Sequence, residues 1–225
     1  MVVNLELYVD VSKRLKKMSP DNENYQYEYA ASILNLGISH FGQNDYSQAL
    51  EQFKKSKSEF EKLVPSTPFN NEYEYGYAEN LGWISRTLQR VNRIDEARIF
   101  RLEEGRQCEK ILSSSKDTNW QALYLYAASN RSLAVIDYRN SDLKNAKKFA
   151  NTAAGLFEQL TSHDSTNEDW LSGLAYTQAV LMAAYDRSGE IQQANKYKDL
   201  FESNIRKVKG FEKFSAAQFV EKYIE

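Results

Sequence analysis

The chain has 225 residues, with 29 Lys and Arg against 31 Asp and Glu, so its formal net charge is −2. It lacks the clustered basic excess of a nucleic-acid-binding protein, and no apolar run reaches the roughly 18 residues that a membrane span needs. One cysteine cannot form an internal disulfide, and only three prolines and nine glycines favour long helices. We therefore expect a cytoplasmic protein that binds no nucleic acid and does not insert into a membrane.

Residues 1–22 predict a single helix followed by a turn. Tyr8, Val11, Leu15 and Met18 recur at helical spacing, and Ser19-Pro20-Asp21-Asn22 ends the segment. The pattern matches the second helix of a hairpin whose first helix is absent. Two explanations remain open at this stage: the chain is a fragment of a longer protein, or this helix is an N-terminal cap. For a fragment, a periplasmic location is also open.

Four alanines, Ala49, Ala97, Ala146 and Ala194, recur 48, 49 and 48 residues apart in similar polar surroundings. A fixed period of this size is the signature of stacked repeats, in which each unit buries its apolar face against its neighbours. Nineteen residues before each of these positions the chain again has alanine. Small residues at these two positions of every repeat predict that the two helices that carry them approach each other closely. These earlier alanines are Ala30, Ala78, Ala127 and Ala175.

Each repeat is predicted to be a hairpin of two helices, each about 18–21 residues long. Before each marker alanine, side chains at steps of four, four, three and four trace one stripe of a first helix. Beyond it, aromatic and aliphatic residues at helical steps trace a second helix, and Ser, Pro or Gly residues end the unit. The four hairpins are residues 23–69, 70–117, 118–166 and 167–210.

Residues 211–225 predict a short capping helix. Ser215 and Gln218 form the sequence of a capping box that opens a helix from Ala216 to Ile224. Phe214, Phe219 and Ile224 could then cover the last hairpin, as the end of a solenoid requires. The predicted fold is an all-α solenoid of about nine to ten antiparallel helices, organised as a single domain over residues 1–225.

The sequence resembles the tetratricopeptide repeat family. Leu36-Gly37, Ala49 and Phe53 follow that pattern of a leucine–glycine pair, an alanine and an aromatic, although Ser85, Ala134 and Met182 replace the glycine in later units. The openings Asp117-Thr118-Asn119-Trp120 and Ser165-Thr166-Asn167-Glu168-Asp169-Trp170 are similar to a longer-helix bacterial subgroup, whose arrays often follow a kinase or winged-helix domain. The resemblance implies a right-handed superhelix that binds protein, and it transfers no enzyme activity.

Residues able to perform chemistry are few and scattered. His40 lies on the inward stripe, which favours a packed core histidine, and His163 falls in a predicted loop far in sequence from any partner. Cys108 lies on the buried face of a second helix, where cysteine acts as a small hydrophobe. The carboxylates among residues 51–62 are interspersed with lysines, which predicts a solvated face of mixed charge. We expect no enzyme activity, no cofactor and no metal.

Three polar residues replace apolar ones near the inward stripe: Asn130, Asp137 and Gln178. Their spacing is consistent with a buried hydrogen-bond network, since buried polar groups need partners. The alternative is that the stripe is only half buried in these units. Both alternatives remain open from the sequence.

The groove lined by first helices is the predicted binding surface. Trp83, Tyr138 and Tyr176 are its candidate apolar anchors, and Arg86 and Arg131 are its candidate partners for acidic groups. The groove face also carries Arg90, Arg139, Ala183, Asp186 and Arg187. The three arginines of that set end first helices, so a structural role beside Asp95, Asp142 and Glu190 is the alternative.

The carboxylate clamp of heat-shock co-chaperones needs a lysine and an asparagine, and the corresponding positions here resemble Leu34 and Ile38. That clamp is therefore not expected. The sequence predicts a non-catalytic scaffold that binds a protein or an acidic peptide, as a regulatory part of a larger bacterial signalling protein. The alternative is a self-associating or sensory module that controls an attached effector domain, such as a kinase or transcription regulator, with a homo-oligomer formed through residues 5–18.

Overall fold

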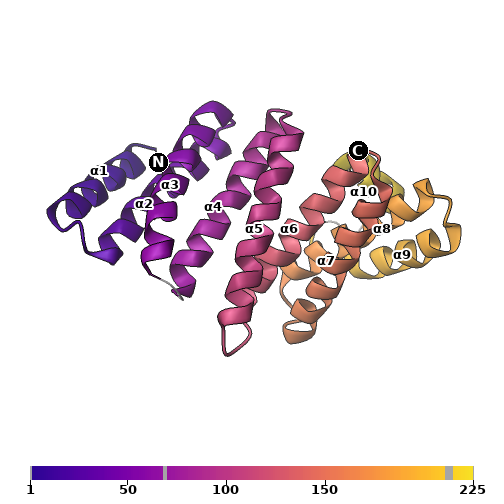
Figure 1. Cartoon of the computed structure of the whole chain (residues 1–225). Helices are drawn as coiled ribbons and strands as arrows, with labels where there is room; N and C mark the ends of the chain where they lie inside the picture. The colour runs from indigo at the N-terminus through magenta and orange to yellow at the C-terminus, as the bar shows by residue number, and fades with distance from the viewer. Residues whose placement is uncertain (1, 68–69, 211–214, 225) are drawn as a thin grey trace. The chain divides into compact units, whose positions relative to one another are not determined.

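The computed structural model describes residues 2–67, 70–210 and 215–224, with the side chains of residues 2 and 3 left out. These residues form ten α-helices and no strand (Figure 1), which confirms the predicted all-α class. None of the described helices is long and apolar enough to cross a membrane. The chain divides into two compact units, Met1–Asp117 and Thr118–Glu225, and each is described by itself.

The helices have nearly uniform lengths. The four first helices each span 20 residues, and three of the four second helices span 21. Unit 1 contains α1 (Val2–Met18), α2 (Glu23–Gly42), α3 (Tyr46–Ser66), α4 (Asn71–Arg90) and α5 (Ile94–Ser114). Unit 2 contains α6 (Trp120–Arg139), α7 (Leu143–His163), α8 (Glu168–Arg187), α9 (Ile191–Ile205) and α10 (Ala216–Tyr223).

Within each unit, helices that follow one another in sequence pack against one another. In unit 1, α1 contacts α2, α2 contacts α3, α3 contacts α4, and α4 contacts α5. In unit 2 the same order runs from α6 to α9, and α10 packs on α8 and α9. This arrangement is that of a helical-repeat solenoid, as the period of the alanines predicted.

Every first helix starts at the same cap. Asn22, Asn70, Asn119 and Asn167 are the N-cap residues of α2, α4, α6 and α8, and each side chain accepts a hydrogen bond from the backbone N–H three residues on. An asparagine in this position satisfies one of the backbone donors that a helix start leaves unpaired. The caps are therefore spaced like the marker alanines.

Every hairpin turns through a residue with positive φ at the same position of the repeat: Asn44 (62°), Asn92 (59°), Ser141 (64°) and Gly189 (77°). The next residue donates its N–H to a carbonyl five positions back, at 2.8–3.0 Å in all four turns. This is the Schellman closure of a helix C-terminus. Each turn has only three residues between its helices, so the second helix returns directly along the first.

Small residues let the helices approach closely, as the sequence predicted. Ala30, Ala78, Ala127 and Ala175 have no exposed surface, and neither do the first three marker alanines. Glycines serve the same purpose against rings. A methyl group on Gly37 would lie 2.6 Å from the Phe53 ring, and one on Gly173 would lie 2.2 Å from the Phe157 ring. Both rings are fully buried.

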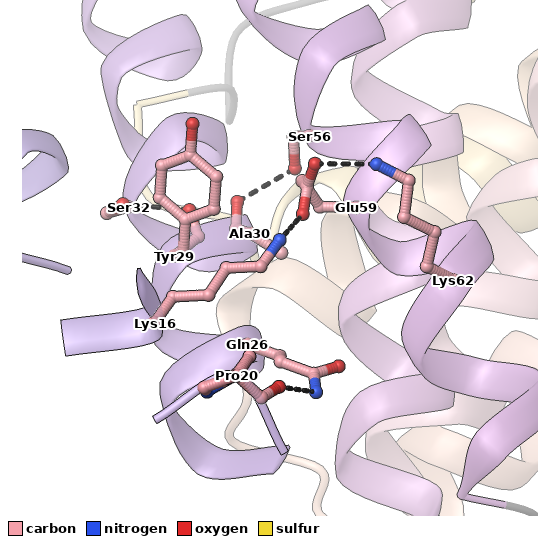
Figure 2. Close-up of polar contacts among 9 residues, drawn as sticks. All are labelled: Lys16, Pro20, Gln26, Tyr29, Ala30, Ser32, Ser56, Glu59 and Lys62. Atoms are coloured by element: carbon pink, nitrogen blue, oxygen red, sulfur yellow. Dashed lines mark hydrogen bonds and ion pairs between the residues drawn. The ribbon is translucent and has the colours of Figure 1, made fainter. Parts of the chain in front are cut away.

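Helix α1 is attached to α3 by an ion pair, and α3 is attached to α2 by a hydrogen bond (Figure 2). Lys16 bonds Glu59 of α3, which also accepts from Lys62 at 3.0 Å. The Ser56 hydroxyl of α3 donates to the Ala30 carbonyl at 2.9 Å. Burial alone would raise the pKa of Glu59, but the two lysine ammonium groups outweigh it and lower the pKa. The expectation of a wholly solvated charged face was therefore wrong at Glu59, because α1 covers it.

The predicted capping box opens α10: Ser215 N–H donates to the Gln218 side chain at 3.1 Å, and Gln218 N–H donates to the Ser215 hydroxyl at 3.3 Å. Phe219 and Ile224 are buried, with 4% and 0% exposed. Phe214, the third predicted capping residue, lies outside the described residues.

Candidate functional site

Unit 2 contains a cavity of about 920 Å³ beside α10. Its walls are the end of α6, the second half of α8, the first half of α9, and α10. Ligand pockets typically have volumes of about 300–1,000 Å³. The cavity is lined by Tyr138, Arg139, Met182, Ala183, Asp186, Arg187, Ala194, Asn195, Lys198, Ala216, Ala217, Val220 and Glu221.

The cavity has an apolar floor and a charged rim. Alanines and buried aromatic or aliphatic side chains form the floor, and all five charged residues of the lining are exposed. Three of these are cations, Arg139, Arg187 and Lys198, and two are anions, Asp186 and Glu221. The rim therefore has a small positive excess, which suits a ligand that carries a carboxylate beside an apolar group.

The two rim arginines are held by oxygen atoms of the fold. Arg139 Nε donates to the Ile224 carbonyl of the C-terminal segment at 2.7 Å. Arg187 donates to the Tyr138 carbonyl at 3.3 Å and to the Ser141 hydroxyl at 3.0 Å, and its guanidinium lies 5.4 Å from the Tyr138 ring centre. A guanidinium carries five N–H donors, so these bonds fix its position without using all of its donors.

Helix α10 lies on part of the predicted groove. The Tyr176 hydroxyl of α8 donates to the Tyr223 carbonyl at 2.5 Å, and its ring packs edge-on against Phe219 at 5.3 Å. Burial raises the pKa of Tyr176, and the charges of Arg131 and Arg139 only partly oppose this effect. Tyr176 thus binds the chain's own C-terminal helix in this structure, and its role as an anchor for a partner stays a prediction.

Arg131 lies over two rings of unit 2. Its guanidinium carbon is 5.0 Å from the Tyr176 ring centre and 5.5 Å from that of Phe157. Cation–π contacts of this length orient an arginine as well as stabilise it. The pairing of Arg131 with an acidic partner stays a prediction, and the structure gives this side chain a packing role that the sequence did not indicate.

In unit 1, Trp83 of α4 is half-buried between rings of the preceding hairpin. Its ring lies 5.3 Å from Phe41 and is stacked on Phe53 at 6.0 Å. Arg86 is exposed, and its guanidinium lies 4.8 Å from the Trp83 ring. Arg90 is also exposed, at the end of α4. Trp83 therefore offers only part of its ring to a ligand, with Arg86 over it.

The three polar residues of the inward stripe are buried: Asn130 is 5% exposed, and Asp137 and Gln178 are each 2% exposed. The stripe is therefore not half buried at these three positions, and a hydrogen-bond network that joins them stays a prediction. Asn130 donates to the Tyr126 carbonyl one turn earlier at 2.9 Å, and Gln178 accepts from Asn204 of α9 at 3.1 Å. The side-chain amides of Asn130 and Gln178 therefore form hydrogen bonds with two different neighbours.

The candidate reactive groups are not among the residues that line the cavity. His40 is half-buried with Nδ1 3.8 Å from an Asp45 carboxylate oxygen, and Cys108 is fully buried, which raises the pKa of its thiol. His163 is the last residue of α7, so the expectation that it lies in a loop was wrong, and its ring stacks on Trp120 at 3.9 Å. No group of three or more His, Cys, Asp and Glu residues that could hold a metal occurs in the described part of the chain.

Sequence reasoning missed a buried ion pair on α5. Arg101 and Glu104 are 2.6 Å apart, with 7% and 1% of their side chains exposed. Gly82 of α4 makes room for them, since a methyl group there would lie 2.5 Å from a Glu104 carboxylate oxygen. The available signal was the glycine in the middle of a first helix, combined with opposite charges three residues apart.

No protein-family model matches the chain. No curated protein sequence matches it. The chain is similar in structure to BtubC (BKLC) from P. vanneervenii, with a TM-score of 0.52 and 15% sequence identity, over 90% of this chain and 89% of that one. This likeness shows the fold alone.

Proposed function

We propose that this chain is a non-catalytic protein-interaction scaffold, and that the cavity of unit 2 binds a peptide segment that carries a carboxylate. The observation that supports this proposal is the combination of an apolar floor with three cations on one rim. Five of the lining residues, Tyr138, Arg139, Ala183, Asp186 and Arg187, belong to the groove face that the sequence predicted. The α9 and α10 residues complete the wall.

Recognition would combine two interactions. An apolar side chain of the peptide packs on the cavity floor beside Tyr138 and Val220. An adjacent carboxylate of the peptide accepts hydrogen bonds from Arg187 and forms an ion pair with Lys198. Arginine binds carboxylates with parallel N–H donors, and aromatic residues in pockets are frequent binding hot spots. Because the rim is exposed, its charges should mainly select the partner and weaken with added salt.

The test uses charge reversal at Lys198, which lines the cavity from α9. The complete chain is titrated with a library of labelled peptides, each acidic peptide being paired with its Asn/Gln counterpart. We expect acidic peptides to bind, the amide counterparts to bind less, and Lys198→Glu to weaken binding about tenfold, or about 1.4 kcal/mol. Lys196→Glu is the matched control, since Lys196 is exposed on the same helix outside the cavity lining.

Equal effects of the two lysine variants would mean that the cavity does not bind the peptide. Equal binding of acidic peptides and their amide counterparts would remove the role of the carboxylate. Circular dichroism of both variants checks that the helices remain formed. The Arg86→Glu and Arg131→Glu variants, measured with the same peptides, test whether the rest of the predicted groove contributes to capture.

We also propose that this scaffold is a tetratricopeptide-type array in the regulatory part of a larger bacterial signalling protein of the cytoplasm. The support is the resemblance of the helix openings at residues 117–120 and 165–170 to the bacterial subgroup. A complete reading frame that joins these repeats to a kinase or winged-helix domain would agree with this proposal. A frame that contains a secretion signal would contradict the cytoplasmic location.

A further inference from the structure

Helix α1 has an apolar stripe on its exposed face. Seven large apolar side chains are exposed in the described residues, and three of them lie on this one helix. They are Leu7, Val11 and Met18, with 61%, 45% and 78% exposed. With Arg14 they occupy steps of four, three and four, which is the spacing of a seam for packing against another helix.

The opposite face of α1 holds the helix firmly in unit 1. The Ser12 hydroxyl lies 2.8 Å from the Ser32 hydroxyl and is buried, Tyr8 donates to Glu28, and Lys16 bonds Glu59. The stripe is therefore presented on a fixed helix, and packing another helix on it requires little ordering of the backbone. Burying such apolar side chains would supply the main favourable free energy.

The charges beside the stripe select the occupant. The first half of α1 carries the acidic Glu6 and Asp10, and the second half carries the basic Lys13, Arg14 and Lys17, all of them exposed. A second α1 in antiparallel orientation brings the acidic half of each helix against the basic half of the other. A parallel pair would place like charges together.

We propose that α1 is a homodimer interface in which two copies of this chain pack antiparallel through this stripe. In this arrangement Leu7 meets Met18 of the second copy, and Val11 meets the aliphatic stem of its Arg14. Asp10 faces Lys17 of the second copy, and the same contacts recur by two-fold symmetry, as an isologous interface requires. None of the interface residues lines the cavity in unit 2.

Sedimentation equilibrium of the complete chain, over about 1 µM to 1 mM, measures the association, because this range covers dissociation constants of transient dimers. We expect a monomer–dimer equilibrium that the Leu7→Gln/Met18→Gln variant shifts to monomer. Ile99→Gln is the matched control: Ile99 is 60% exposed on α5, so its replacement should leave the equilibrium unchanged. A monomer throughout the range, with or without a helix from another protein, would overturn the proposal.

A charge exchange tests the orientation. Lys17→Glu should weaken the dimer, because the introduced carboxylate then faces Asp10 of the second copy, and the double variant Asp10→Lys/Lys17→Glu should restore it. Rescue is specific to this pairing, since a non-specific apolar contact would respond only to the apolar variants. Failure of the double variant to recover dimerisation, with helicity intact, would refute the antiparallel arrangement.

Cysteine cross-linking supplies an independent distance. Leu7→Cys/Met18→Cys should form an intermolecular disulfide, whereas Leu7→Cys alone should not, because antiparallel copies separate the two positions by about 16 Å along the helix. Cys108 is fully buried and should form no cross-link. Cross-linking of the single variant would indicate a parallel pair and contradict the proposal.

Discussion

The contact between Gly173 of α8 and Phe157 of α7 allows a sharp test of how closely the hairpins pack. An alanine methyl group at position 173 would lie 2.2, 2.5 and 2.8 Å from three carbons of the Phe157 ring. Ordinary contacts of this kind are 3.4–4 Å, so the ring would have to move by more than 1 Å. The ring has no exposed surface, so any movement must displace neighbouring core atoms.

Gly173→Ala combines two opposing effects. In an exposed helix interior, alanine stabilises the fold by about 1 kcal/mol relative to glycine. Overpacking in a tightly packed core costs about 1–3 kcal/mol. Because the overlap with Phe157 is severe, we expect the clash to dominate and the free energy of unfolding to fall by about 1–2 kcal/mol. Urea denaturation, followed by circular dichroism, measures this change.

Gly155→Ala on α7 is the matched control. A methyl group at position 155 meets no atom within 4 Å, so only the helix propensity acts, and the free energy of unfolding should rise by about 0.5–1 kcal/mol. The same substitution should therefore have opposite signs at the two positions. If Gly173→Ala stabilised the protein as much as Gly155→Ala, the close approach of α7 and α8 would be refuted.

A second substitution isolates the contact. Phe157→Leu should by itself destabilise the protein, because it leaves a cavity in the core. In that background, however, Gly173→Ala should become neutral or stabilising, since the shorter side chain vacates the space of the ring. The expected coupling between the two sites is at least about 1 kcal/mol, as found for residues in direct contact. Additive effects would contradict the structure.

Three further predictions follow from local features. Gly189→Ala should lower the free energy of unfolding by about 1 kcal/mol because alanine is strained at positive φ; urea denaturation measures this change. Glu59→Gln should cost about 0.5–1 kcal/mol at pH 7. Because the folded-state pKa of Glu59 is lowered, this difference should disappear as the pH falls below 4.5, which denaturation at a series of pH values checks; a constant difference would exclude the ion pair with Lys16. The Cys108 thiol should resist a thiol reagent in the native protein and react on unfolding, because burial raises its pKa; rapid labelling of the native protein would contradict this.

The repeat could be predicted from the sequence because its signals are local. The alanines at two fixed positions, the helical stripes and the capping box at Ser215 depend on residues close in the chain, and the helices appear where these signals place them. The predicted single domain over residues 1–225 stays a prediction, since each compact unit is described by itself.

The candidate site depended on contacts that local signals do not contain. The placement of α10 on Tyr176, and with it the cavity wall, involves residues 47 positions apart. The partly covered Glu59 and the stack of Trp120 on His163 likewise depend on which helix packs where. Periodicity predicted the groove face of each first helix, but it could not predict that the chain's own last helix would cover part of it.

The turns within hairpins and the links between hairpins should differ in how well they tolerate an inserted residue. All four turns have three residues, at 43–45, 91–93, 140–142 and 188–190, whereas the links between hairpins have four, five and four, at 67–70, 115–119 and 164–167. The one 49-residue interval between marker alanines therefore takes its extra residue in the link at 115–119. The turns close by backbone bonds that an added residue would break, so insertions such as an epitope tag should be tolerated in the links and not in the turns.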